Sequence, residues 1–347
     1  DSKLSEDVRA RINVLSEIPA QWRLKARQWR QMNQRFKLDF NGQEMPSRND
    51  EYLFYQILIG VWPANNDVPS DELIERVKNY MLKAAREAKE TTSWANQNLD
   101  YEKALTEFVG AVLRESNQEF LADFASFEKS IITAGMMNSL SQVLIKYTSP
   151  GVPDLYQGNE LCELRLVDPD NRGRVDYLLR QTRLCDLVSA AHKDRTNQIK
   201  KMASAMVNGT DHEGNAKLFF TWRALTARRQ HLALFRDGQY LPLNVQGPLS
   251  KHLIAFARKN EDAEAIIVAP RLCAQLLASG SAIQDSSLWK DTYIELPDTL
   301  TAHEYHDYLS YAPCSAASEE SGVRVLKASD LFRDFPWALL TTEPAAN

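Results

Sequence analysis

The chain has 347 residues, enough for one large domain or two ordinary ones, and 44% of them are apolar, so it can bury a substantial core. Its formal charge of −5, with both signs interspersed, excludes the basic field that binds nucleic acid or an anionic membrane and favours a neutral or small polar substrate. No apolar run approaches the roughly 20 residues that a bilayer span requires, so no membrane partner is expected.

Targeting and redox signals favour a cytoplasmic location. The first residues, DSKLSEDVRARI, hold neither an initiator Met nor the hydrophobic region of a signal peptide, and the chain opens at what looks like the start of a helix. We therefore expect a cytoplasmic protein of which this chain is one part. No metal and no cofactor is expected, because the cysteines have neither CxxC nor zinc-ligand spacing and are interpreted as reduced thiols: Cys162, Cys185, Cys273 and Cys314.

The first 120 residues have the periodicity of helices. SEDVRARINVLSEIP predicts a helix with Ser5 as its N-cap and Pro19 as its stop, with apolar side chains on one face. PSDELIERVKNYMLKAAREAKE repeats this design with Ser70 as N-cap, and YEKALTEFVGAVLRE predicts a further helix. We interpret their apolar stripes as core faces.

Downstream, helix and strand signals alternate. SIITAGMMNSLSQVLIKYTSP predicts a mostly apolar helix ending at Pro150, and GVPDLYQGNE then has the pattern of a buried strand and the loop after it. Residues from about 174 to 236 return to a helical pattern. After Gly238 the short runs YLPL, HLIAFAR, AIIVAP and DTYIELP predict a small all-β terminal domain, in which YAPCSAASEESG is interpreted as a mobile loop.

The polar stretch VDPDNRGRVDY is the strongest candidate for chemistry. Carboxylates and Arg can hydrogen-bond vicinal sugar hydroxyls in pairs with fixed geometry, which makes such a set typical of a sugar site. An ordinary turn with internal salt bridges explains the same composition, and composition alone favours that reading because Asp-Pro and Asp-Asn are common turn formers. Its polar residues are Asp168, Asp170, Asn171, Arg172, Arg174 and Asp176.

Three further polar stretches are weaker candidates. KETTSWANQNLDY holds Trp94 between polar turn residues, where it either stacks on a sugar face or packs on neighbouring helices. The other two are RNDEYLFYQ, whose Asn49, Asp50 and Glu51 could simply cap the helix that follows, and the N-terminus, with Asp1, Lys3, Glu6 and Asp7.

The stretch SPGVPDLYQGNELCELRLVDPDNRGRVDY resembles the C-terminal half of the maltooligosyltrehalose synthase family, within the α-amylase superfamily. The resemblance extends to SEDVRARINVLSEIPAQW, RNDEYLFYQILIGVWP, MLKAAREAKETTSW, LFFTWRAL, ALFRDGQYLPL and DFPWALL. It thus covers nearly the whole chain, most thinly over residues 180–215 and 270–325.

The resemblance implies an α/β fold: the C-terminal part of a TIM (β/α)8 barrel with large helical insertions, followed by a small all-β domain. In the superfamily, G-x-P-x-x-x-x-G-x-E marks the eighth barrel strand and its loop, and Gly151, Pro153, Gly158 and Glu160 match it. The implied ranges are 1–237 for the barrel part, about 20–120 for the helical insertion, about 151–157 for the eighth strand, about 216–235 for the last barrel helix and 238–347 for a β-sandwich-like domain.

The resemblance also assigns site residues. DSKLSED aligns with the family run that follows the seventh strand, so Asp1 takes the place of the third catalytic carboxylate, which stabilises the transition state, and Lys3 is retained while Leu4 replaces an Arg. The loop after the eighth strand should border the substrate cleft, since active sites of such barrels lie at the C-terminal ends of the strands. The implied substrate-binding residues are Lys3, Trp94, Glu160, Asp168, Asp170, Asn171 and Arg172.

The implied activity is the rearrangement of the reducing-end α-1,4 bond of a maltooligosaccharide into an α,α-1,1 bond, by retaining intramolecular transglycosylation. In the family the nucleophilic Asp and the acid/base Glu come from earlier barrel strands, so the partners implied are the maltooligosaccharide and the missing N-terminal half of the barrel, and this chain alone is expected to be inactive. Two alternatives remain open: a hydrolase of the same superfamily acting on trehalose-capped or malto-oligosaccharides, and a noncatalytic glucan-binding fragment.

Overall fold

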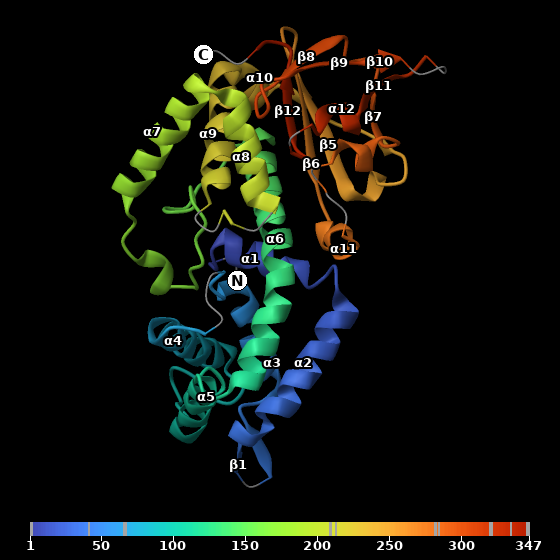
Figure 1. The fold of residues 1–347 in the computed structure, drawn as a ribbon. Coiled ribbons are helices and arrows are strands. Elements are labelled where there is room, and N and C mark those ends of the chain that lie inside the picture. The colour runs from blue at the N-terminus through green and yellow to red at the C-terminus, as the bar shows by residue number, and fades with distance from the viewer. Residues whose placement is uncertain are drawn as a thin grey trace. The chain divides into compact units, whose positions relative to one another are not determined.

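The computed structural model describes residues 3–40, 42–64, 68–207, 210–211, 214–280, 283, 285–318, 322–333 and 335–344. The chain is a mixture of helices and sheets (Figure 1). It divides into two compact units, one formed by residues 1–135 and 163–174 and the other by residues 136–162 and 175–347.

The first unit is mainly helical. Its helices are α1 (Glu6–Val14), α2 (Pro19–Asn33), α3 (Arg48–Val61), α4 (Asp71–Ala88), α5 (Leu99–Val112) and the first part of α6 (Gln118–Thr148), with the short 3-10 helices η1 (Gln34–Phe36) and η2 (Asp170–Arg172). The strands β1 (Leu38–Phe40) and β2 (Gln43–Met45) form an antiparallel hairpin. The sequence analysis did not predict this hairpin, although the Asn-Gly pair between the two strands is a typical signal of a two-residue hairpin turn.

Aromatic side chains build the core of the first unit. Trp29 is fully buried, and its ring centroid lies 4.8 Å from that of Phe124. Trp62 lies 4.7 Å from the same Phe124 ring and is 1% exposed, so three rings from α2, the end of α3 and α6 meet at one point. Aromatic contacts of this kind add to the free energy of burial, which holds the helices together.

Helix caps follow the sequence in part. Ser70 caps α4 as predicted, since its hydroxyl accepts the Leu73 N–H at 3.2 Å. Ser5 precedes α1 but makes no side-chain cap there. The cap of α3 is Ser47, which accepts the Asp50 N–H at 3.1 Å, so residues 49–51 lie in the first turn and do not supply the N-cap.

Helices and two antiparallel sheets form the second unit. Its helices are the last part of α6, α7 (Tyr177–Lys193), α8 (Arg195–Val207), α9 (Asn215–Gln230), α10 (Leu232–Asp237), α11 (Cys273–Ala278) and α12 (Ala328–Leu331). One sheet has the strand order β3-β5-β6-β12-β8-β9 and the other β10-β11-β7-β4. The strands are β3 (Gln239–Pro242), β4 (Val245–Gln246), β5 (Leu253–Lys259), β6 (Glu264–Pro270), β7 (Tyr293–Leu296), β8 (Glu304–Asp307), β9 (Pro313–Ser315), β10 (Ala317–Ser318), β11 (Arg324–Lys327) and β12 (Ala338–Thr341), with the 3-10 helices η3 (Ser250–His252) and η4 (Ser286–Trp289) between them.

The sheets and the helices before them share one core. Phe220 of α9 lies 5.3 Å, ring to ring, from Trp337, whose indole N–H donates to Ser141 of α6 at 2.9 Å. Leu140 and Phe235 belong to the same buried cluster as β5, β6 and β12. The boundary expected between residues 237 and 238 therefore lies inside a single compact unit.

Two local predictions differ from the structure. Residues 151–157 form no helix or strand, because a strand is defined by its hydrogen bonds to a neighbour and none pairs with this segment in the described ranges. The predicted mobile loop contains β9 and β10, which pair with β8 and β11. No helix of the described ranges combines the length and the apolar run that a membrane crossing requires.

Candidate functional site

The loop Glu163–Arg174 is bound to the N-terminal segment of the first unit. The backbone N–H of Ser5 donates to the Arg165 carbonyl at 3.0 Å, and the Ser5 hydroxyl donates to the Glu163 carbonyl. Asp7 accepts the Glu163 N–H at 2.9 Å. The side chain predicted to cap α1 therefore binds a loop about 160 residues away in the sequence, which explains why it makes no cap.

Asp170 is held by α4. Arg76 donates to both of its carboxylate oxygens, from Nε to Oδ1 at 2.9 Å and from Nη2 to Oδ2 at 2.8 Å. The Leu166 N–H adds a bond to Oδ2 at 2.7 Å. Burial alone would raise the pKa of Asp170, but the bonds from Arg76 and Leu166 outweigh it and lower the pKa below its usual value. Asp170 is thus an ionised residue that shapes the loop.

Asp168 joins three cations. Its Oδ1 lies 3.1 Å from Lys83 Nζ and 3.4 Å from Lys3 Nζ, and its Oδ2 lies 3.4 Å from Arg172 Nη2. Lys83 also donates to the Asp168 carbonyl at 2.8 Å. The hydrogen bond from Lys83, followed by that from Lys3, lowers the pKa of Asp168. Neither aspartate of this loop therefore has the raised pKa that a general acid needs at neutral pH.

Two neighbouring side chains, Asn171 and Arg172, have hydrogen-bonding groups without a partner in the described residues. Asn171 donates from Nδ2 to the Lys3 carbonyl at 3.3 Å, while its buried Oδ1 has no hydrogen bond within the described residues. The Arg172 side chain is 70% exposed and makes only its contact with Asp168 in that part of the chain. The exposed donors of Arg172 are the kind of groups that bind sugar hydroxyls, whereas the Asn171 acceptor is buried.

Arg165 fixes the end of the same loop. It donates to Glu163 at 3.0 Å and to the Arg174 carbonyl at 3.0 Å. A Cβ atom at Gly173 would lie 2.3 Å from Arg165 Nη1, so the glycine provides the space that this side chain crosses.

The other predicted site residues have different surroundings or lie beyond the described ranges. Trp94 lies between α4 and α5 and is 55% exposed, with the Arg86 guanidinium 4.8 Å from its ring centroid. Glu160 belongs to the second unit, where its carboxylate accepts from Arg180 at 3.1 Å. Asp1, the predicted transition-state stabiliser, lies outside the described residues.

Sequence reasoning did not identify Arg76 and Lys83, although both contact the predicted loop. They are seven residues apart on α4, and an i, i+7 pair lies on one face of a helix. The apolar stripe of α4 predicts its core face, whereas the side chains that contact the loop lie on its polar face.

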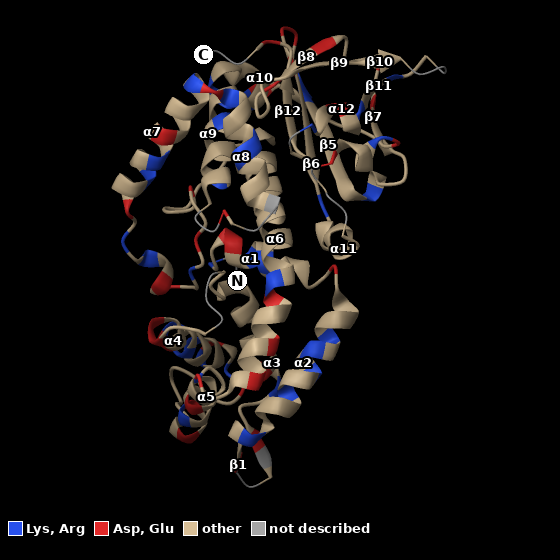
Figure 2. Ribbon diagram, in the orientation of Figure 1, with Lys and Arg blue, Asp and Glu red and all other residues tan. Residues whose placement is uncertain are grey.

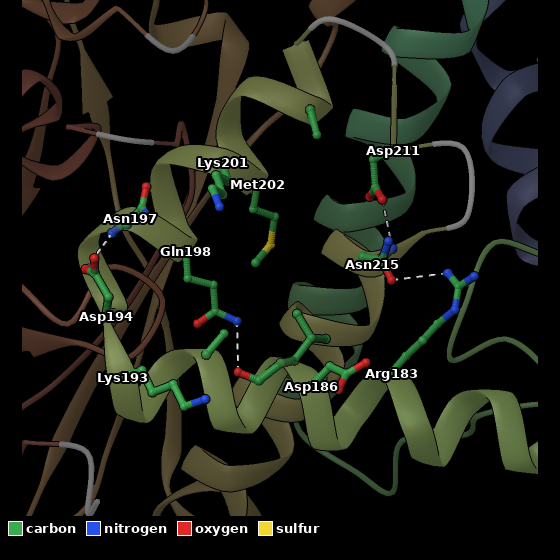
Figure 3. Close-up of a pocket in the computed structure, with 13 residues that line it drawn as sticks. Arg183, Asp186, Lys193, Asp194, Asn197, Gln198, Lys201, Met202, Asp211 and Asn215 are labelled. Atoms are coloured by element: carbon green, nitrogen blue, oxygen red, sulfur yellow. Dashed lines mark hydrogen bonds between the residues drawn. The ribbon is translucent and has the colours of Figure 1, made fainter.

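A second hollow, of about 520 Å³, lies between α7, α8 and the start of α9 (Figure 3). Its charged side chains have both signs, and some are already bonded: Arg183 donates to Asn215 Oδ1 at 3.2 Å, and Asp211 accepts the N–H groups of Asn215 and Ala216. Burial raises the pKa of Asp211. Because this lining favours no single class of ligand, we assign it no function. The described residues contain no group of three or more His, Cys, Asp or Glu that could hold a metal ion.

Comparison with known proteins gives one consistent result. No protein-family model matches the chain. Putative maltooligosyl trehalose synthases of two Mycobacterium tuberculosis strains are 30% identical to it over 348 residues, a match that covers 99% of this chain and 37% of each relative. The structure of maltooligosyltrehalose synthase from Arthrobacter ramosus matches with a TM-score of 0.71 and 31% identity, over 97% of this chain and 37% of that one. A hypothetical maltooligosyl trehalose synthase of Sulfolobus tokodaii matches with a TM-score of 0.62 and 26% identity, over 98% of this chain and 37% of that one.

All of these relatives carry the name maltooligosyl trehalose synthase. The chain is similar to maltooligosyltrehalose synthases over nearly its whole length, and it spans about 37% of the length of those it matches. The resemblance predicted from the sequence motifs is confirmed.

Proposed function

We propose that this chain is part of an enzyme that converts the reducing-end α-1,4 bond of a maltooligosaccharide into an α,α-1,1 bond. The observation that carries the proposal is the similarity to maltooligosyltrehalose synthases over 97–99% of the chain, in sequence and in structure together. The similarity includes the loop that holds Asp168 and Asp170, because it leaves almost no segment of the chain outside the match.

In this proposal the loop Glu163–Arg174 forms one wall of the sugar site. Asp170 and Arg76 hold its shape, and Asp168 with Lys3 and Lys83 orients Arg172. Arg172 and Asn171 then contact sugar hydroxyls. Glu160 braces the loop before α7 through Arg180, which also donates to the Gly158 carbonyl at 2.6 Å.

The chemistry is a retaining transglycosylation. Such reactions use two carboxyl groups about 5–5.5 Å apart, one as nucleophile and one as acid/base, and pass through an oxocarbenium-like transition state. The released glucose stays bound, turns and attacks through its anomeric hydroxyl, so water must be excluded. Asp1 stabilises the transition state, while the nucleophile and the acid/base come from the rest of a TIM barrel of the α-amylase superfamily. The barrel part would be residues 1–237, the β-sandwich-like domain residues 238–347, and the chain by itself is inert.

Arg172→Ala tests the role of the loop in the longer cytoplasmic enzyme. We expect kcat/KM for maltohexaose to fall about tenfold or more, because a charge-assisted hydrogen bond to the sugar is lost. Arg174→Ala is the matched control: its side chain is also exposed, and within the described residues it is its backbone carbonyl, not its side chain, that binds the loop. Equal rates for the two variants would show that Arg172 does not contact the substrate.

A noncatalytic glucan-binding role is the second candidate, and the exposed Trp94 favours it. A ring that is 55% exposed and supported by Arg86 has the geometry of a stacking surface for a sugar ring. This candidate predicts that maltohexaose binds to the chain, that Trp94→Ala weakens the binding, and that the longer protein shows no turnover. A hydrolase would instead release glucose or trehalose.

A further inference from the structure

A pocket of about 420 Å³ lies between α2 and α3 in the first unit, separate in its residues from the loop of the proposed sugar site. Its volume falls in the range of small-molecule sites, about 300–1,000 Å³. The lining is unusual for a chain whose net charge is −5, because it is mostly basic and aromatic. The residues that matter are Arg23, Arg27, Arg30, Arg48, Trp22 and Tyr52.

Three of the four arginines have side chains without a bonding partner in the described residues. The side chains of Arg23, Arg27 and Arg48 make no hydrogen bond, ion pair or ring contact to any residue that the structure describes. Arg30 differs, since it lies 3.4 Å from Glu44 and 3.8 Å from Glu51. The surface of the pocket itself is mostly apolar, and three of the arginines among its lining residues are exposed, with guanidinium donors that have no partner in the described residues.

The charge of α2 points the same way. Four of its fifteen residues are Lys or Arg and none is Asp or Glu. Figure 2 shows basic residues recurring along α2. Arg23 and Arg27 are four residues apart on one face, a like-charge spacing that destabilises a helix. A bound anion would relieve this repulsion.

The one acidic residue of the pocket does not cancel these charges. Glu51 is 2% exposed, and its Oε2 lies 2.7 Å from the buried Lys37 Nζ. Its Oε1 accepts the Tyr55 hydroxyl at 3.0 Å. Because Lys37 already compensates the Glu51 carboxylate, the net positive charge of the three free arginines remains.

An aromatic wall completes the pocket. The Trp22 indole N–H donates to the Tyr52 hydroxyl at 2.7 Å, and the two ring centroids are 5.7 Å apart. Tyr52 is 45% exposed, so one of its surfaces is open to a ligand. The pocket thus combines anion-binding donors with a fixed apolar surface.

We propose that this pocket binds a phosphate monoester of a small organic molecule. A phosphate monoester is close to a dianion at neutral pH, and each guanidinium group can bind two of its oxygens. A carboxylate carries one charge and two oxygens, so it would occupy fewer of the donors of three arginines. The organic part contacts Tyr52 and Trp22. This inference is independent of the proposed sugar chemistry, since it uses none of the residues of that site.

Calorimetric titration of the 347-residue chain at low ionic strength tests the proposal, because screening weakens exposed charges at higher salt. The probes are glucose 6-phosphate, glucose as its uncharged match, and inorganic phosphate. We expect saturable one-site binding of glucose 6-phosphate, weaker binding of inorganic phosphate and none of glucose. Glucose 6-phosphate should also raise the thermal midpoint of the chain.

Charge removal in the pocket gives the second arm. Arg27→Gln and Arg48→Gln should each weaken glucose 6-phosphate binding about tenfold or more, and Arg27→Lys should weaken it less. Arg229→Gln is the matched control, an exposed arginine of α9 that likewise makes no contact in the described part of the chain. No saturable binding to the unmodified chain, or unchanged affinity in both Gln variants, overturns the proposal. Equal affinity for phosphate and glucose 6-phosphate overturns the role of the organic part.

Discussion

Arg76 binds Asp170 through two hydrogen bonds, Nε to Oδ1 at 2.9 Å and Nη2 to Oδ2 at 2.8 Å. The same guanidinium donates to the Leu164 carbonyl at 2.7 Å, so one side chain of α4 fixes two points of the loop Glu163–Arg174. The pair joins α4, a helix that the sequence predicts, to the loop Glu163–Arg174, for which the sequence allowed both an ordinary turn and a sugar site.

Asp170→Asn should destabilise the first unit by about 1–3 kcal/mol, because a charge-assisted pair is replaced by weaker neutral bonds in a partly buried site. Urea unfolding followed by circular dichroism measures this free energy. Glu75→Gln is the control: Glu75 pairs with Lys78 on the same helix, but its side chain is 63% exposed, so the change should stay within about 0.5 kcal/mol. Equal effects of the two substitutions would contradict the role assigned to Asp170.

The loop should lose stability in acid. The pKa of Asp170 is lowered in the folded state, and that of a free Asp is about 3.9. Its contribution to the free energy of unfolding is therefore fully present above about pH 4 and is lost as the pH falls through the lower, folded-state value. The difference in unfolding free energy between the wild type and Asp170→Asn should shrink below pH 4. A difference that grows in acid would show that the pKa is raised instead.

Gly60→Ala should separate α1 from α3. A Cβ atom at Gly60 would lie 2.5 Å from Val8 Cγ1 and 3.3 Å from the Val8 carbonyl oxygen. Overpacking of this kind costs about 1–3 kcal/mol, which exceeds the gain of roughly 0.5–1 kcal/mol from replacing a helical Gly by Ala.

The matched control for that change is Gly110→Ala in α5. Its Cβ would meet only the end of the Lys78 side chain, with Lys78 Cε at 3.1 Å, which can move aside. Thermal unfolding should show a lower midpoint for Gly60→Ala and an unchanged or higher one for Gly110→Ala. Equal midpoints would mean that α1 and α3 pack less closely than described.

Lys37→Met should be strongly destabilising. Lys37 and Glu51 form an ion pair at 2.7 Å in which both side chains are 2% exposed. Removing one partner of a buried pair costs about 3–5 kcal/mol when the other charge is left without compensation, and Arg30, 3.8 Å from Glu51, offsets only part of that cost here. The double variant Lys37→Met with Glu51→Leu should recover most of this loss, and chemical denaturation of both proteins measures it. No recovery would show that the pair is not the source of the cost.

The sequence predicted helices best where an apolar stripe and a cap coincide. Ser70 and the stripe that follows it indicated α4, and the β-favouring runs after Gly238 indicated β3, β5, β6 and β7. These signals are local, because hydrogen bonds within a helix and alternation along a strand need no distant partner. The short strands β8 to β10 were missed because each depends on its neighbours in the sheet.

For the candidate site, the sequence predicts which polar residues are present but not which contacts they make. The sequence shows that VDPDNR is a polar loop. It does not show that Asp170 is hydrogen-bonded by Arg76 while Arg172 is exposed. That difference depends on contacts between residues about 90 positions apart. Ser5 gives the same lesson: its residue type and position indicated a helix cap, yet its hydroxyl binds the Glu163 carbonyl.

The central claim is that this chain is one part of a transglycosylating isomerase. Maltohexaose incubated with the chain alone and with the protein that includes the predicted upstream barrel strands tests it most directly, with product structure and reducing ends measured together. The account predicts no product from the chain alone, and from the longer protein a nonreducing hexasaccharide in which reducing ends are lost and the number of glycosidic bonds is unchanged. Released glucose or trehalose as the main product, or turnover by the chain alone, would contradict it.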